Sequence, residues 1–236
     1  MRLARPPLRR IHYTAPSRRD WLMIAVGAVV TLAIMEIIHV IDNAQVAIRP
    51  ESAGVTAPWI PLTVKYWSGP IDDMAKKYDI DPNLLAIIMT LESGGYAKAN
   101  SGEAQGLMQV TPLTAKDIAS KYLKKPVAHY NIWDPRTNIE FGAAYLAFLR
   151  DTFGEASQGP DWSSTVELVA AGYNGGPGAA HNLLVGNGLK DTQTVIYSRD
   201  AFNMWRERHA EDSPTYDRWL ERGGSTLIDA AKAAKQ

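Results

Sequence analysis

Cysteine is missing from all 236 residues of the sequence. Its absence excludes disulfide bonds, thiolate zinc sites, iron–sulfur clusters and cysteine nucleophiles. The five histidines show no metal-ligand spacing, and no His-Glu-x-x-His motif is present. We therefore expect neither a metal nor a cofactor.

The chain also lacks net charge, with 25 basic residues against 25 acidic ones. The charges are distributed unevenly, because residues 1–20 hold six arginines and only one acidic residue. From residue 43 onward, 19 basic residues face 22 acidic ones. A slightly acidic body argues against non-specific binding to nucleic acid, so we expect no nucleic-acid partner.

A single long hydrophobic run, residues 21–41, interrupts an otherwise mixed sequence. It has 21 residues, and its first fifteen carry no charge. A helix that crosses the hydrocarbon layer needs about 20 mostly apolar residues, and preceding arginines favour a cytoplasmic N-terminus. We expect residues 1–20 to be a basic cytoplasmic segment, residues 21–41 a transmembrane anchor, and the remainder to lie outside. A cleaved signal peptide, a twin-arginine export signal and a buried helix of the core are the alternatives.

The rest of the chain divides by composition into a linker, a domain and a tail. Residues 42–61 are rich in proline and small residues without periodicity, which favours a linker. Residues 62–208 carry helical signals and few strand signals, so we expect a mainly α domain with one groove. Residues 209–236 form either a packed C-terminal helix or a frayed extension.

Proline marks most of the expected helix starts. Asp81-Pro82, Thr111-Pro112 and Asp134-Pro135 each pair a capping residue with proline at the first helical position. The expected helices cover residues 71–78 after Pro70, the segments after those three pairs, 162–171, a short helix from Pro177, and 192–208, with a glycine-rich loop at 172–178.

Glu92 stands out on physical grounds. It lies near the end of an apolar helix, on the same face as Leu85, Ile88 and Met89, and glycines follow at 94 and 95. A carboxyl group in apolar surroundings has a raised pKa and keeps its proton near neutral pH. A general acid requires this property.

Two polar segments complete the pattern. Residues 105–109 (QGLMQ) place amides beside leucine and methionine before a helix start. Residues 171–178 (AGYNGGPG) hold a tyrosine–asparagine pair in a glycine-rich stretch, which offers a ring to stack on a sugar and an amide to bind its hydroxyl or acetamido groups. The stretch lacks the terminal Lys-Ser/Thr of a phosphate-binding P-loop.

These motifs resemble, in order, those of the lytic transglycosylases of the soluble-lytic-transglycosylase (SLT) type. The matching segments are Glu92-Ser93-Gly94, residues 106–109, Tyr173-Asn174 with the following glycines, and Thr194-x-x-Tyr197. Family-like sequence also lies between the motifs, at residues 78–82 and 132–146. The resemblance covers about residues 65–205.

The resemblance implies a goose-type-lysozyme-like helical fold and cleavage of bacterial peptidoglycan. It implies that Glu92 protonates the oxygen of the β-1,4 bond between N-acetylmuramic acid and N-acetylglucosamine. Glu92 would then act as base toward the muramic 6-hydroxyl, which forms a 1,6-anhydromuramic end. It further implies that Met108, Gln109, Tyr173 and Asn174 bind the glycan, and that Ser93, Gly106 and Tyr197 support the site. Ser93 and Tyr197 would hold the Glu92 carboxyl group. Glu103, near the second motif, is interpreted as a solvated loop residue.

Two other functions remain open for the same fold. A muramidase would use water as the nucleophile, and a glycan-binding module would have lost catalysis. With the anchor, the first function predicts a single-pass protein of the bacterial inner membrane whose catalytic domain faces the periplasm. Its expected partners are the membrane, the glycan strands of peptidoglycan and an envelope-spanning machine.

Overall fold

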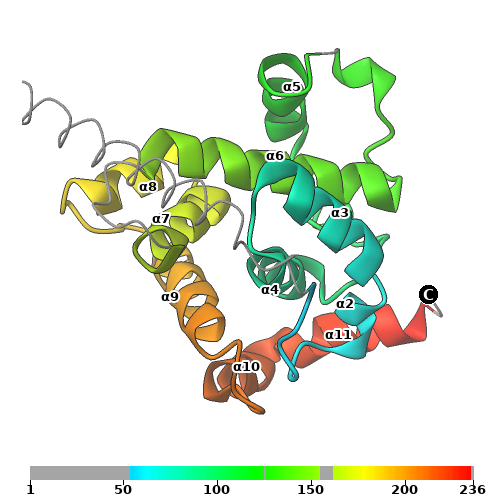
Figure 1. Ribbon diagram of the computed structural model, residues 1–236, viewed down its shortest axis with the longest axis vertical. Helices are drawn as coiled ribbons and strands as arrows, with labels where there is room; N and C mark the ends of the chain where they lie inside the picture. Colours follow the sequence, from blue (N-terminus) through cyan, green and yellow to red (C-terminus); the bar gives the residue numbers. More distant parts are fainter. Residues whose placement is uncertain (1–53, 125, 155–161, 235–236) are drawn as a thin grey trace, which may run out of the picture. The chain divides into compact units, whose positions relative to one another are not determined.

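The computed structural model describes residues 54–124, 126–154 and 162–234 (Figure 1). In this part of the chain helices dominate and no β-strand forms; two isolated bridges join Asn100 to Gln105 and Gln105 to Val110. The mainly α prediction is thereby confirmed. The helices are α2 (Leu62–Lys65), α3 (Ser68–Tyr78), α4 (Pro82–Ser93), α5 (Pro112–Lys121), α6 (Pro135–Phe153), α7 (Trp162–Gly175), α8 (Pro177–Leu184), α9 (Thr192–Arg206), α10 (Pro214–Trp219) and α11 (Ser225–Ala233).

The predicted cytoplasmic segment and anchor, residues 1–20 and 21–41, lie outside the described residues and stay predictions. Within the described residues, no helix combines the length and the apolar character that a membrane span requires.

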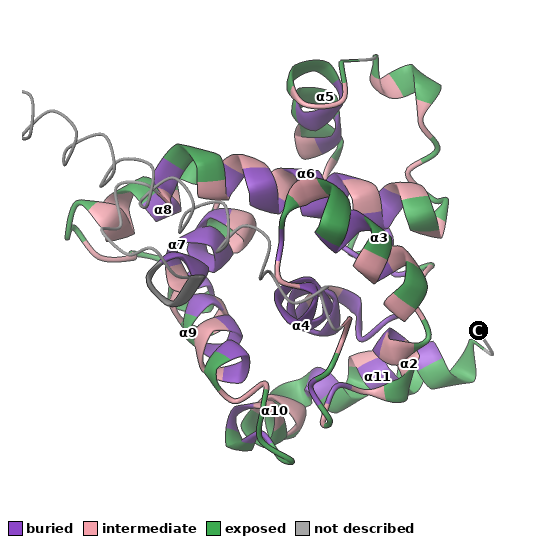
Figure 2. Ribbon diagram, in the orientation of Figure 1, coloured by how far each residue is buried: buried purple, intermediate pink, exposed green. Residues whose placement is uncertain are grey.

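Helix α4 lies at the centre of the fold, where Figure 1 shows it end-on among its neighbours. It contacts α2, α3, α9 and α11. Each of its twelve residues except Glu92 is buried, and the helix is mostly purple in Figure 2. A helix that is apolar on all sides is driven into the core, so its one accessible carboxyl group stands out.

The three predicted caps are confirmed. The side chains of Asp81, Thr111 and Asp134 each accept a hydrogen bond from a backbone N–H in the first turn of α4, α5 and α6. Such caps satisfy N–H groups that have no partner inside the helix. They fix where the site-bearing helices begin.

Three helix boundaries differ from the prediction, the smallest difference being that α9 ends at Arg206 and not at residue 208. Helix α3 begins at Ser68, before the expected start at residue 71, and α7 continues to Gly175, past the expected end at residue 171. The predicted loop at 172–178 is therefore wrong. Gly172 lies inside α7, and a β-carbon there would approach Leu149 Cδ2 to 2.7 Å and Ala180 Cβ to 3.1 Å. This glycine allows close helix packing and does not mark a turn.

The two ends of the domain pack more tightly than the sequence suggests. Residues 54–61, assigned to the linker, reach the core: Ala57 and Ile60 are buried, and the N–H groups of Thr56 and Ala57 donate to Asn83 Oδ1. Asn83 thus fixes the non-helical backbone at residues 56–57 against the start of α4. The linker assignment to 42–61 is wrong for its last residues.

The C-terminal segment, residues 209–236, takes the packed alternative over its described part. Helix α10, a π-helical turn (Leu220–Gly224) and α11 follow one another, and Ile228 and Ala231 of α11 are buried. Helix α11 contacts both α2 and α4. The segment therefore belongs to the same compact unit as the domain.

Candidate active site

Glu92 and Tyr197 form the centre of the candidate site. The Tyr197 hydroxyl of α9 donates a hydrogen bond of 2.6 Å to Glu92 Oε1 at the end of α4. The two residues are 105 positions apart in the sequence, and the packing of α4 against α9 joins them. The predicted contact of Tyr197 with the Glu92 carboxyl group is present in the structure.

The Glu92 carboxyl group titrates near neutral pH. Burial raises its pKa from 4.5 to about 7, and the hydrogen bond from Tyr197 lowers the pKa by a smaller amount. Desolvation dominates because the apolar end of α4 cannot solvate a charge as water does. The sequence-based expectation of a sheltered, raised-pKa carboxyl group agrees with this environment.

The loop between α4 and α5 is held by Asn138 of α6. Its Oδ1 accepts from the Met108 N–H at 2.7 Å, and its Nδ2 donates to the carbonyl oxygens of Gln105 and Ile132. Gly106 lies against this amide at φ +78°, where a β-carbon would approach Asn138 Nδ2 to 2.4 Å. Gly106 therefore supports the site by allowing this close contact.

Ser93 does not hold the Glu92 carboxyl group, contrary to prediction. Its buried hydroxyl donates to the Leu107 carbonyl at 2.7 Å and accepts from the Gly95 N–H at 3.2 Å. A hydroxyl group has one proton to donate, and here the backbone takes it. Ser93 instead fastens the loop to the end of α4.

Met108 also differs from the prediction that it lines the groove. Its side chain is fully buried, and it fills the space that Gly142 of α6 leaves open. Its carbonyl oxygen accepts a 2.8 Å hydrogen bond from the Tyr173 hydroxyl. Met108 thus contributes its backbone to the site, by holding the Tyr173 hydroxyl, while its side chain packs in the core.

Gln109 has a left-handed backbone, with φ 44°. Its Nε2 donates to the carbonyl oxygens of Ala99 and Gly106 at 3.1 and 2.9 Å. The amide nitrogen is engaged with the loop, so the amide oxygen is the group left for a ligand.

Tyr173 and Asn174 lie next to each other near the end of α7. Burial raises the pKa of Tyr173 well above 10, and the charge of Glu92 raises it further, which places this ring near the carboxyl group. The Asn174 Oδ1 accepts from the buried Thr194 hydroxyl at 2.9 Å. The structure thus brings Tyr197 and Tyr173 close to Glu92, and the Met108 carbonyl oxygen binds the second of these tyrosines.

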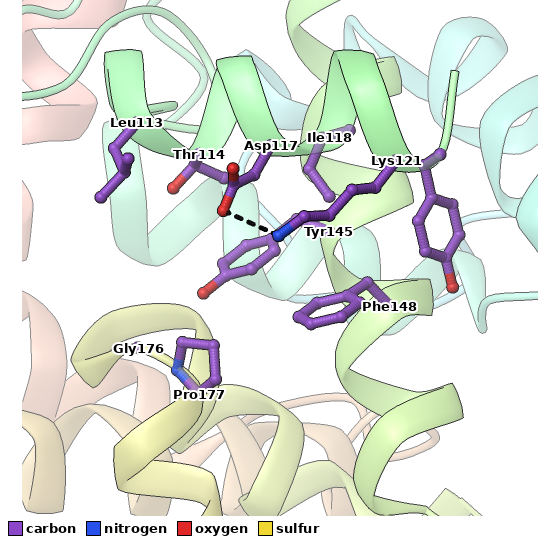
Figure 3. Close-up of a pocket in the computed structure, with 10 residues that line it drawn as sticks. Leu113, Thr114, Asp117, Ile118, Lys121, Tyr145, Phe148, Gly176 and Pro177 are labelled. Atoms are coloured by element: carbon purple, nitrogen blue, oxygen red, sulfur yellow. Dashed lines mark hydrogen bonds and ion pairs between the residues drawn. The ribbon is translucent and has the colours of Figure 1, made fainter. Parts of the chain in front are cut away.

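An aromatic pocket of about 260 Å³ lies beyond Tyr173. Figure 3 shows Tyr145 and Phe148 of α6 between α5 on one side and Pro177 at the start of α8 on the other. The ring centroids of Tyr145 and Tyr173 are 5.3 Å apart, and the Tyr145 hydroxyl donates to the Gly172 carbonyl. A row of aromatic rings therefore leads from the Glu92 region to this pocket.

Two further pockets border α9 and share Gln193. The first, of about 670 Å³, is lined by Asn174, Thr194 and exposed Glu103, among others. The second, of about 540 Å³, is lined by Tyr197, Arg222 and their neighbours. Pockets of this size are large enough to bind a ligand of one or a few sugar units.

Two residues that shape the site have no role that the sequence reveals. Asn138 belongs to a segment of family-like sequence, but its link to the Met108 N–H depends on tertiary contact. The Thr194 hydroxyl likewise bonds Asn174, which lies twenty positions away in the sequence. Both side chains are buried, and the sequence alone does not distinguish a short polar side chain in the core from one that caps a helix.

Comparison with known proteins agrees with this geometry. Residues 69–196 match the family model "Transglycosylase SLT domain", which is more than half of the chain. Membrane-bound lytic murein transglycosylase C of Serratia proteamaculans (strain 568) is 34% identical over 147 residues, covering 60% of this chain and 38% of that protein.

Other relatives are shorter matches. The enzyme of the same name from Actinobacillus pleuropneumoniae serotype 5b (strain L20) is 40% identical over 110 residues, which is 45% of this chain and 29% of that protein. Membrane-bound lytic murein transglycosylase E of Buchnera aphidicola subsp. Acyrthosiphon pisum (strain APS) is 37% identical over 98 residues, or 40% and 44% of the two chains. The chain thus spans less than half the length of these relatives. Its helical site and the family match together show that the chain belongs to the transglycosylase SLT domain family.

Proposed function

We propose that this chain is a peptidoglycan lytic transglycosylase. It cleaves the β-1,4 bond between N-acetylmuramic acid and N-acetylglucosamine and leaves a 1,6-anhydromuramic end. The observation that carries the proposal is the Glu92 carboxyl group, which is sheltered at the end of a buried helix, bonded to Tyr197 and has a pKa of about 7. The relatives are named lytic murein transglycosylases, which supports peptidoglycan (murein) as the substrate.

Glu92 performs both proton transfers in the proposed mechanism. In its neutral form it donates a proton to the oxygen of the scissile bond, and the Tyr197 hydroxyl then stabilises the carboxylate that forms. The carboxylate takes the proton of the muramic 6-hydroxyl as that oxygen attacks the anomeric carbon. Because burial raises the pKa of Glu92 to about 7, one carboxyl group is able to make both transfers near neutral pH.

The glycan is proposed to lie along Tyr173, Asn174 and the Gln109 amide. The Asn174 side chain lines the pocket that borders α9, and its Nδ2 is left to donate to a sugar, because Thr194 occupies its oxygen. The aromatic pocket with Tyr145 gives sugar units a flat apolar surface. This division between rings and amides suits a polar polymer with apolar ring faces.

A location at the bacterial inner membrane completes the proposal. Residues 21–41 would anchor the chain and place the domain in the periplasm, and the relatives are named membrane-bound. A tethered enzyme cuts the wall locally, which suits the opening of a gap for an envelope-spanning machine.

Product analysis tests the function directly. The full chain is incubated with purified sacculi, and the released muropeptides are analysed by mass spectrometry. A transglycosylase gives anhydro ends that are one water lighter than the reducing ends of a muramidase. Glu92→Gln is expected to lower the rate by a factor of roughly 10² to 10⁴ while the circular dichroism spectrum is unchanged.

Reducing ends as the product would replace the proposal with a muramidase. Tight binding to sacculi without any release by the wild-type chain would indicate a glycan-binding module. Full activity of Glu92→Gln would remove Glu92 from the mechanism.

A further inference from the structure

The second pocket on α9 is built partly by residues beyond the family match. The match ends at residue 196, whereas Trp219, Arg222 and Gly224 come from the segment around the π-helical turn. Tyr197, the partner of Glu92, lines the same pocket. A C-terminal element of this chain therefore forms a wall immediately beside the proposed catalytic pair.

Arg222 supplies the accessible charge in this pocket. Its Nη2 donates to Asp200 Oδ2, and the Arg222 side chain is 44% exposed whereas that of Asp200 is 12% exposed. The buried carboxylate holds the guanidinium in place, and this contact occupies only one of its three nitrogens. The pocket thus presents an anchored positive group to a ligand.

Apart from the amide of Gln193, the remaining lining is apolar or aromatic. Leu91, Ile196 and Trp219 surround the charged pair, and Gly224 leaves room for the Trp219 ring, since a β-carbon there would lie 2.3 Å from Cδ2. A guanidinium beside apolar surface suits a carboxylate attached to a short aliphatic chain. A neutral sugar unit would leave that charge unused.

We propose that this pocket binds the peptide stem of the substrate, with Arg222 on a peptide carboxylate. The inference rests on the proposed function. In N-acetylmuramic acid the peptide is attached through the lactyl group at C3, within the same sugar ring as the C1 bond that Glu92 protonates. A peptide-bearing ring placed at Glu92 must therefore direct its peptide into space bordering the site, and the Tyr197 pocket is such a space.

The test compares glycan strands that carry peptides with the same strands after an amidase has removed the peptides. The full chain is expected to cleave the peptide-bearing strands with the lower KM. Arg222→Gln is expected to raise KM on these strands roughly tenfold and to leave KM and kcat on stripped strands unchanged. Arg199→Gln removes an equal charge from the exposed surface of α9, outside the pocket lining, and is expected to retain the preference.

A second pair of variants addresses the unpaired carboxylate. Arg222→Gln leaves Asp200 buried without its partner, so the double variant Asp200→Asn with Arg222→Gln removes both charges. It is expected to lose the preference for peptide-bearing strands as the single variant does. Equal loss on both substrates, or a fall in kcat alone, would show a structural role and overturn the proposal.

Binding separates this inference from the catalytic one. N-acetylmuramic acid linked to a dipeptide is titrated into Glu92→Gln and followed by the NMR signal of the Trp219 indole. The expected result is a shift that weakens at least tenfold when the peptide carboxylate is amidated or when Arg222→Gln is added. Absence of that difference overturns the peptide pocket, whereas absence of cleavage by the wild-type chain, with this binding intact, overturns the lytic function alone.

Discussion

Two opposing effects set the proton affinity of Glu92. Removal from water disfavours the carboxylate, and the Tyr197 hydroxyl favours it, yet the pKa remains near 7 because desolvation is the larger effect. The site therefore holds a group that donates and accepts a proton with similar ease at neutral pH. A single carboxyl group can then serve both halves of the proposed reaction.

We predict a decline in activity above about pH 7. Glu92 must carry a proton to act as the acid, and its pKa of about 7 sets the pH at which half of the molecules are competent. Tyr197→Phe removes the hydrogen bond that lowers this pKa, so the decline is expected at higher pH, and kcat is expected to fall about tenfold or more because the carboxylate loses a stabilising donor. The pH dependence of kcat/KM on sacculi measures the shift in the free enzyme, and kcat measures the loss of rate.

The control for that experiment is Tyr66→Phe, which changes an exposed phenol on the surface. It is expected to leave the pH profile unchanged. A profile of Tyr197→Phe that coincides with the wild type would show that the hydrogen bond has no part in the titration.

Glu92 also makes the stability of the fold depend on pH. Between pH 4.5 and 7 the folded state binds the Glu92 proton more tightly than the unfolded state, so stability falls as pH rises through this window. The loss is of the order of 3 kcal/mol, since each pKa unit corresponds to about 1.4 kcal/mol. Glu92→Gln removes this loss, and we expect the variant to be more stable than the wild type at pH 8.

Urea denaturation at pH 5 and pH 8 measures the difference. The stability gain of Glu92→Gln is expected to be larger at pH 8 than at pH 5. An equal gain at both values would mean that the carboxyl group is solvated in the folded state.

At the scale of elements, local chemistry explains which features the sequence could predict. The starts of α4, α5 and α6 follow from a capping side chain next to proline, and both signals act within one turn. The extension of α7 through Tyr173 does not, because Gly172 serves the packing of α7 against Leu149 and not a turn. Glu92 was predictable from its helical face, whereas the engagement of Ser93 with Leu107 depends on a contact across fourteen residues.

The loop before α5 provides a test of the Asn138 contact. Gly106 and Gly102 both have positive φ, at 78° and 89°, but a β-carbon meets Asn138 only at position 106 and open space at position 102. Alanine at either position has a strain of about 1 to 3 kcal/mol, and Gly106→Ala adds about 1 to 3 kcal/mol from overpacking. We expect Gly106→Ala to lose more stability in urea and most of the activity.

Gly102→Ala is the matched control and is expected to retain activity. Equal effects of the two substitutions would show that backbone strain alone, without the Asn138 contact, determines the shape of the loop.

The cap of α4 does more than begin a helix. Asp81 accepts from the Asn83 N–H and from the Trp205 indole N–H at 2.7 Å, and its carboxylate also lies 3.4 Å from Arg208 Nε. We expect Asp81→Ala to cost about 2 to 4 kcal/mol, because a cap and a charged hydrogen bond to α9 are both lost. Asp134→Ala, which removes a cap at the start of α6, is expected to cost about 1 kcal/mol.

Chemical denaturation of the two variants gives the comparison. A loss for Asp81→Ala no larger than that for Asp134→Ala would mean that the bond to Trp205 contributes no net stability.

At the scale of the whole domain, the first and the last described segments both contact the central helix. Asn83 near the start of α4 holds the incoming segment at Ala57, and α11 lies against Gly94 just beyond the other end of α4. A β-carbon on Gly94 would lie 2.8 Å from the Leu227 carbonyl carbon and 2.9 Å from the Ile228 N. The C-terminal segment is therefore in direct contact with the turn that follows Glu92.

This contact predicts that a residue far from the sugar controls the reaction. Ile228 is buried at the Gly94 turn, and Ile228→Ala leaves a cavity that is expected to cost about 2 to 5 kcal/mol. Because the cavity frees the end of α4, the distance between Glu92 and Tyr197 becomes less well defined. We expect kcat on sacculi to fall severalfold at a temperature where the variant is still folded, with KM nearly unchanged, since Ile228 touches neither pocket on α9. Thr226→Ala, on the exposed side of α11, is expected to leave both parameters at the wild-type values. A stability loss without any change in kcat would mean that α11 stabilises the fold but does not help to position Glu92.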